Sequence, residues 1–226
     1  MKSQFIKLVL VLIPIFTLLV PLETYSQEKP MWYGVKGGWN FAFNNIDAAN
    51  ANVQGKSGFV GGGVFEYRVS DLFAINTNLL YNMKGNEWEG TTSYLWFQET
   101  ETVTWSFNYL SIPIAAKFAF GGQTKFYLLI GPEFSFLLSA EEVTKGEDDE
   151  ETIDFKEEEI ASSFELAGNF GFGVDIYIKP VILFFEVRGS LSFTDVLQDK
   201  PNGTIQFIEE GTVRNLVPSL SVGILF

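Results

Sequence analysis

The 226-residue sequence contains no cysteine and no histidine, and it has few cations. Without cysteine, the chain can form neither disulfide bonds nor thiolate metal sites. Without histidine, it lacks the usual base of hydrolytic sites. Lys2, Lys7 and Glu23 fall in a leader segment, so 13 of 15 Lys and Arg and 27 of 28 Asp and Glu follow it. We therefore expect no enzyme, no metal or cofactor and no nucleic-acid partner.

The leader, residues 1–26, predicts a secretory signal peptide that is cleaved before Gln27. A retained membrane anchor is the alternative, but Pro14 and Pro21 interrupt a run that is short for a bilayer-spanning helix. No cysteine follows the run, which excludes a lipoprotein anchor. No second long apolar run occurs either, so the rest of the chain, residues 27–226, is predicted to be one exported domain.

Apolar residues alternate with small or polar ones in eight segments of that domain. In "LFFEVRGSLSF", Leu183–Phe193, the polar positions include Glu186 and Arg188. A strand directs alternate residues to opposite faces, whereas a helix would spread the charges around its circumference. The pattern therefore predicts an all-β fold, and its other segments are 33–41, 58–69, 72–84, 108–120, 125–138, 164–177 and 215–226.

The connections between these strands are alternately short and long. Short turns are predicted at Ser70–Asp71, Gly121–Thr124 and Lys179–Pro180. The long polar connections are approximately 44–56, 85–106, 139–163 and 196–212. An even number of strands with short turns at one end and long loops at the other is typical of outer-membrane barrels. We predict an eight-stranded antiparallel up-and-down transmembrane β-barrel with a packed polar lumen.

A soluble lipocalin-like ligand carrier is the main alternative fold, and it would direct its apolar face inward. Here the polar face is rich in Gly, Ala, Ser and Asn, which suits a narrow lumen better than a water-facing surface. Aromatic residues also gather at the strand ends, as in membrane-interface girdles. At the turn end we assign Trp32, Tyr33, Tyr67, Phe73, Phe118 and Phe126 to such a girdle.

The lumen-facing positions carry a balanced set of charges. Five are cations and five are anions: Lys36, Arg68, Lys84, Lys117, Arg188, Glu66, Glu133, Glu165, Asp175 and Glu186. Charges removed from water must pair and form hydrogen bonds. We expect a network of ion pairs that closes the lumen, with Glu186 and Arg188 near Glu66 and Arg68. A proton or ion path is the functional alternative.

Two of the long loops have distinctive compositions. Residues 141–159 hold 11 acidic residues against two lysines but lack the spacing of a calcium loop, so we predict a mobile solvated segment. A divalent-ion bridge to lipid phosphates is the alternative. The loop before Trp105 predicts a projecting hairpin with possible partner-contact residues. These are Trp88, Tyr94, Trp96 and Phe97.

The end of the sequence places Leu220, Val222, Ile224 and Phe226 at alternate positions. This pattern resembles the signal by which barrel-assembly machinery recognises outer-membrane barrels. We therefore expect that machinery to be a partner of the chain.

Several motifs together resemble the PorT-like outer-membrane β-barrel proteins, often labelled porin family. They are "GVKGGWNF", "LLYNMKG", "YLSIPIAAKF", "YLLIGPEFSFLL", "FGFGVDI" and "SVGILF". The resemblance spans nearly all of the predicted domain. It implies a location in the outer membrane of a Gram-negative envelope and carries over no catalytic residues. The family includes a component associated with protein secretion, whereas the acidic loop is not part of its shared pattern.

Three functions follow from these expectations. The first is a non-enzymatic outer-membrane barrel that presents extracellular loops or supports a secretion or envelope assembly. The second is a small pore for ions or solutes, and the third is the soluble carrier. The expected partners are outer-membrane lipid, the assembly machinery and other envelope or secretion proteins.

Overall fold

A computed structural model describes residues 30–46, 53–93, 98–145, 150–155, 160–197 and 213–226. The predicted signal peptide lies outside these residues. Every named element in them is a strand: β1 (Met31–Ile46), β2 (Val53–Arg68), β3 (Phe73–Ser93), β4 (Gln98–Gly121), β5 (Thr124–Lys145), β6 (Glu150–Asp154), β7 (Phe164–Ile178), β8 (Val181–Ser192) and β9 (Val213–Leu225). Among these residues no helix has the length and hydrophobicity needed to cross a bilayer.

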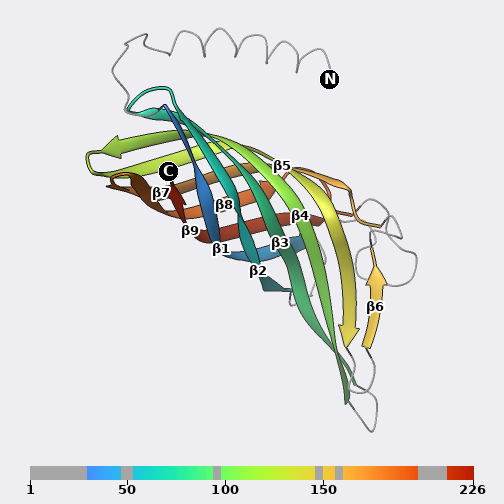
Figure 1. Cartoon of the computed structure of the whole chain (residues 1–226). Coiled ribbons are helices and arrows are strands. Elements are labelled where there is room, and N and C mark those ends of the chain that lie inside the picture. Colours follow the sequence, from blue (N-terminus) through green and yellow to red (C-terminus); the bar gives the residue numbers. More distant parts are fainter. Residues whose placement is uncertain (1–29, 47–52, 94–97, 146–149, 156–159, 198–212) are drawn as a thin grey trace, which may run out of the picture. The chain divides into compact units, whose positions relative to one another are not determined.

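Eight of the strands form a closed antiparallel barrel (Figure 1). Neighbouring strands follow one another in sequence, except that β5 pairs with β7 because β6 lies outside the barrel wall. The pairing of β1 with β9 closes the ring. The predicted fold class, an eight-stranded antiparallel barrel, is confirmed.

The barrel is apolar on its outer surface and polar inside. On β8, Phe185 is 49% exposed whereas its neighbours Glu186 and Arg188 are 3% and 5% exposed. Similar alternation on the other barrel strands leaves Phe, Leu, Ile and Val side chains exposed around the wall. An outward apolar surface of this kind suits hydrocarbon rather than water.

One girdle residue was assigned to the wrong face. Tyr33 is exposed as predicted, but the adjacent Trp32 is buried. Two successive residues of a strand cannot share a face, so only one of the pair can point outward. Trp32 packs inside with Ile182, Phe184 and Leu225.

Three neighbouring strands are much longer than a membrane requires. β3, β4 and β5 have 21, 24 and 22 residues, whereas about 9–11 residues are enough to cross a bilayer. Their pairing continues past the apolar belt, to Ser93↔Gln98 between β3 and β4. The predicted projecting hairpin is therefore present.

The prediction of a mobile, solvated acidic loop is wrong for its described residues. β5 continues through Glu142 to Lys145, and β6 pairs with it from Glu141↔Asp154 to Lys145↔Glu150. Glu142 is buried, and so is Phe155 directly after β6. The acidic composition of this segment gave no sign of the strand β6 or of the buried Phe155, which together hold the segment against the barrel.

Candidate functional site

Glu186 lies at the centre of one ion-pair cluster in the lumen. Its Oε1 is 2.9 Å from Lys36 Nζ and 2.9 Å from Arg188 Nε. Arg188 Nη2 donates a second bond, of 3.0 Å, to Oε2, and the Tyr127 hydroxyl donates to the same oxygen at 3.2 Å. One carboxylate thus accepts hydrogen bonds from two cations and a phenol.

A glycine lets Tyr127 reach that carboxylate. Gly173 on β7 is paired with Tyr127 of β5 on one side and with Glu186 of β8 on the other. A Cβ atom at Gly173 would lie 2.4 Å from the tyrosine hydroxyl. The absence of a side chain there lets the phenol cross one strand to its acceptor.

Lys117 forms the second cluster. Its Nζ lies 2.8 Å from Glu66 Oε2 and 2.7 Å from Asp175 Oδ2. It also stands 3.9 Å above the ring of Tyr127. Arg68 completes the cluster with a 3.0 Å contact from its Nε to Glu66 Oε1.

Glu66 of the second cluster and Glu186 of the first line the same small cavity, but no ion pair joins the two clusters among the described residues. Arg188 pairs with Glu186 on its own strand, and Arg68 pairs with Glu66 on its own strand. Tyr127 joins the clusters instead, because its hydroxyl bonds Glu186 while its ring faces Lys117.

Lys84 forms the third cluster, nearer the loop end. Its Nζ lies 2.9 Å from Glu165 Oε1 and 3.5 Å from Glu133 Oε1. Asn215 donates to Glu165 at 2.9 Å and Asn169 donates to Glu133 at 2.8 Å. These amides supply bonds that one lysine alone could not give to two carboxylates.

The ten predicted lumen charges are thus brought together in three clusters, and nearly all of their side chains are buried. A cavity between Glu66, Lys117, Tyr127 and Glu186 measures only about 10 Å³. Such a volume holds no more than about one water molecule. The middle of the lumen, between its two ends, is a packed polar core.

The turn end of the lumen is apolar and aromatic. Trp32, Ile182, Phe184 and Leu225 pack together there, with Tyr177 against them. The Arg68 guanidinium lies 5.0 Å from the ring centre of Trp32 and 5.1 Å from that of Tyr177. These cation–π contacts join the apolar end to the charged middle.

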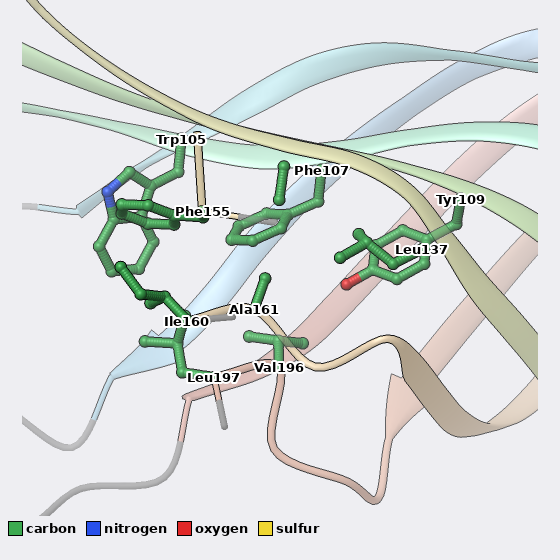
Figure 2. Close-up of a cluster of buried hydrophobic side chains, with 10 residues drawn as sticks. Trp105, Phe107, Tyr109, Leu137, Phe155, Ile160, Ala161, Val196 and Leu197 are labelled. Carbon is green, nitrogen blue, oxygen red and sulfur yellow. The ribbon is translucent and has the colours of Figure 1, made fainter. Parts of the chain in front are cut away.

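The loop end is closed by a second apolar group, which we call the mouth cluster (Figure 2). Its members come from β4, from β5 and from the segments after β6 and β8: Trp105, Phe107, Tyr109, Leu137, Ala140, Phe155, Ile160, Ala161, Val196 and Leu197. The rings of Trp105 and Phe155 meet edge to face at 5.5 Å. The Trp105 indole N–H donates to Glu142 Oε2 at 2.6 Å.

Backbone bonds hold the covering segments of the mouth cluster in place. Phe155 N–H donates to the Ala140 carbonyl at 2.9 Å, and Ser162 N–H donates to the Val196 carbonyl at 2.8 Å. Ala161 and Leu197 form an isolated bridge between the two segments. Segments that are far apart in sequence are thereby tied over one end of the barrel.

Sequence reasoning missed the mouth cluster. Phe155, Ile160 and Val196 lie in irregular segments where no periodicity reveals a buried face. The available signal was the alternation of Trp105, Phe107 and Tyr109, which continues the inward face of β4 beyond the charged residues. Inward aromatics at that end require apolar partners.

Of the four predicted partner-contact residues, the structure describes only Trp88. Trp88 is a β3 residue paired with Val103 of β4 and Val53 of β2. Tyr94, Trp96 and Phe97 lie outside the described residues. Their predicted role stays a prediction.

The predicted assembly residues lie on β9 and directly after it. Leu220, Val222 and Phe226 are exposed, whereas Ile224 is partly buried. Phe226 N–H donates to the Tyr33 carbonyl at 2.8 Å. These residues therefore lie beside the seam where β9 meets β1.

The chemistry available in the described lumen is ion pairing and hydrogen bonding. Within the residues that the structure describes, no group of three or more acidic side chains is placed to hold a metal ion. Each lumen carboxylate has a lysine or arginine within 3.5 Å. The arrangement suits a neutral plug.

Comparisons with known proteins agree with this architecture. A family model described as outer membrane protein beta-barrel domain matches residues 25–198. No curated protein matches the chain.

Similar solved structures include Ail, the attachment invasion locus protein of Yersinia pestis, at 11% identity and a TM-score of 0.44, with 88% of this chain and 100% of that one covered. Neisserial surface protein A gives 13% identity and a TM-score of 0.42, with 88% and 98% covered. OprG of Pseudomonas aeruginosa gives 13% identity and a TM-score of 0.39, with 87% and 95% covered.

Proposed function

The chain belongs to the outer membrane protein β-barrel domain family, and on this basis we propose that it is a sealed, non-enzymatic scaffold that presents its extracellular segments for interaction. The barrel anchors the protein in the outer membrane. The extension of β3, β4 and β5 with β6 is the part that meets partners outside the cell.

The observation that carries this proposal is the filling of the lumen. Charged clusters occupy its middle, and apolar groups occupy both ends. A conducting pore needs a continuous aqueous path, but the cavity between Glu66, Lys117 and Glu186 in the charged middle measures only about 10 Å³. A lipocalin-like carrier would need an apolar pocket where Lys84, Lys117 and Glu186 lie.

Conductance separates a scaffold from a pore. Planar bilayers containing the purified protein should show no stable channels. Stable channels whose current changes in an Arg188→Ala variant would support the pore instead, because Arg188 lies in the lumen.

The absence of cysteine gives a direct test of orientation, because a single introduced thiol is unique. Thr152 on β6 and Gly122 in the β4–β5 turn are both exposed. A membrane-impermeant maleimide added to intact cells should label a Thr152→Cys variant and leave Gly122→Cys unlabelled. The opposite result would place the extension in the periplasm and end the proposal.

We also propose that Leu220, Val222, Ile224 and Phe226 are recognised during assembly. This proposal is supported by their position: they form a row of largely exposed apolar side chains beside the pairing of β9 with β1 that closes the barrel. A Phe226→Ala variant keeps the backbone bond to Tyr33 but loses the ring, so it should insert more slowly with purified assembly machinery. A Phe193→Ala variant, which removes another exposed ring, should insert normally. We further propose that the protein takes part in a secretion or envelope assembly, a role that its resemblance to the PorT-like proteins favours.

A further inference from the structure

The small cavity in the lumen lies where the charged middle meets the apolar group of the turn end. Its apolar wall consists of Val64, Phe184 and Leu225, which belong to that group. Its polar wall consists of six residues: Glu66, Asn76, Asn78, Lys117, Tyr127 and Glu186. The volume, about 10 Å³, is close to the space that one water molecule needs. The hydrogen-bonding groups of the polar wall therefore decide what the cavity can bind.

Asn78 has an unused acceptor beside this cavity. The residue is only 4% exposed. Its Nδ2 donates to Asn76 Oδ1 at 3.1 Å, whereas its own Oδ1 is buried and receives no hydrogen bond from the described residues. Buried polar atoms are nearly always hydrogen-bonded, because an unmade bond is destabilising. Asn78 therefore calls for a donor inside the cavity.

The two carboxylates that line the cavity differ in what they can still accept. A carboxylate offers about four acceptor positions. Glu186 already accepts four hydrogen bonds: one each from Lys36 and Tyr127, and two from Arg188. Glu66 accepts three, from Arg68, Asn76 and Lys117. One acceptor position is thus left at Glu66, and none is left at Glu186.

The charges around the cavity disfavour an ion. The two clusters that meet there hold four cations against three anions: Lys36, Arg68, Lys117 and Arg188 against Glu66, Asp175 and Glu186. A bound cation would add to this positive surplus. An anion would face the acceptor of Asn78 and two carboxylates. A neutral molecule that donates and accepts hydrogen bonds fits both the charge and the lining.

We propose that one water molecule is bound in this cavity and donates hydrogen bonds to Asn78 Oδ1 and to Glu66. Lys117 is the donor to this water, because an ammonium group has three N–H bonds and Lys117 gives one each to Glu66 and Asp175. The water completes the hydrogen bonding of Asn78 and ties it to the second cluster. This inference goes beyond the proposed function and does not depend on the orientation of the barrel.

A crystal structure at a resolution that shows ordered water tests the site directly. A single density peak should lie within about 3 Å of both Asn78 Oδ1 and a carboxylate oxygen of Glu66, as hydrogen bonds require. No density at this place would overturn the inference. A peak surrounded by six or more oxygen atoms at about 2.4 Å would also overturn it, because such a peak is a bound cation such as Ca²⁺.

Filling the cavity tests the same site in solution. Val64→Ile adds one carbon atom to the apolar wall and should expel the water, whereas Val64→Thr has nearly the size of the parent side chain and should retain it. Val60 is also buried on β2 but is not among the residues that line this cavity. Val60→Ile is therefore the matched control for overpacking.

Magnetic relaxation dispersion of ¹⁷O water counts slowly exchanging internal water molecules in the purified protein. The count should fall by one for Val64→Ile and stay unchanged for Val64→Thr and Val60→Ile. An unchanged count for Val64→Ile, or an equal fall for Val60→Ile, would overturn the inference. If Val64→Ile does not fold, the density map of the parent protein still decides it.

These outcomes are separate from those that test the proposed function. A dry cavity, with Thr152→Cys still labelled on intact cells and no conductance, would remove the water site and leave the scaffold proposal standing. Stable channels would remove the scaffold proposal, whatever the cavity holds.

Discussion

The middle of the lumen and its loop end are filled by opposite chemistries. In the middle, five cations and five anions from the barrel strands pair with one another. At the loop end, the mouth cluster buries aromatic rings of β4 under residues from two irregular segments. The charged middle depends on strand residues alone, whereas the mouth depends on chain segments that must fold back.

The two regions should therefore contribute differently to stability: the charged clusters stabilise the barrel wall, whereas the mouth cluster holds the segments that cover its loop end. Removing one member of a buried ion pair leaves its partner desolvated, so a change in the middle should destabilise the whole barrel. The covering segments are tied down by a few backbone bonds and apolar contacts. Changes there should loosen the mouth before they unfold the wall.

The largest effect is expected for Glu186→Ala. This carboxylate is the shared acceptor of Lys36, Arg188 and Tyr127, so its loss leaves two buried cations facing each other. Unfolding by urea in lipid vesicles should show a loss of about 3–5 kcal/mol. Glu141→Ala removes an exposed carboxylate and should cost about 0–1 kcal/mol. Equal effects would mean that water screens the lumen charges.

Arg188→Ala sharpens the same test. Glu186 would keep Lys36 at 2.9 Å and the Tyr127 hydroxyl at 3.2 Å. We therefore expect a smaller loss than for Glu186→Ala but a larger one than for the exposed Glu141→Ala change. The three free energies of unfolding, measured under one set of conditions, give the order directly.

The next largest effect is expected on the opposite face of β8. Phe185 points outward, and an arginine near the middle of the bilayer costs about 2–4 kcal/mol. Phe193→Arg lies near the loop end of the same wall, where the cost falls to about 0–1 kcal/mol. A harmless Phe185→Arg variant would mean that this wall faces water or a protein partner.

At the mouth, Trp105→Phe keeps an aromatic ring but removes the indole N–H. Glu142 would then lose a 2.6 Å donor in a buried position, at a cost of about 1–3 kcal/mol. Trp39→Phe is the matched control because its indole is on the exposed outer wall. Protease cleavage near Phe155 should increase for Trp105→Phe and stay unchanged for Trp39→Phe. Equal cleavage of the two variants would mean that the indole bond does not hold the mouth.

The sequence was sufficient to predict which strand residues point into the lumen and which point outward, because the two-residue period of a strand depends only on neighbouring residues. Lys36, Glu66 and Arg188 could be assigned to the lumen without knowing which strands meet. Their partners could not be assigned in the same way. Partner choice across a barrel depends on strand stagger and on gaps such as Gly173, which lets Tyr127 reach Glu186.

The errors have equally physical causes. Trp32 was placed in a girdle because an aromatic residue at a strand end is typical of one, but the phase of β1 gave the outward position to Tyr33. The acidic loop was predicted to be solvated from its composition. Composition does not show that Ile153 alternates with Thr152, or that Phe155 has a buried place beside Trp105.

The smallest effect on the free energy of unfolding is expected for a change at Lys56, which bonds a polar partner outside the apolar belt. Lys56 Nζ donates to Ser106 Oγ at 2.5 Å, and Lys56 is only partly buried. Lys84, in contrast, is buried between Glu133 and Glu165. The same substitution, Lys to Met, can therefore be compared in two environments with nearly the same change in side-chain size.

Lys56→Met should lower the free energy of unfolding by less than about 1 kcal/mol, because water solvates the groups left behind. Any part of that loss that comes from the attraction between Lys56 and nearby acidic side chains should become smaller at high salt, because salt screens exposed charges. Lys84→Met should cost about 3–5 kcal/mol with little salt dependence, since its two carboxylates stay buried. Urea titrations of both variants at low and high salt measure the difference. A salt-sensitive Lys84→Met loss would mean that ions reach the middle of the lumen, and the charged clusters would then line an aqueous path rather than a plug.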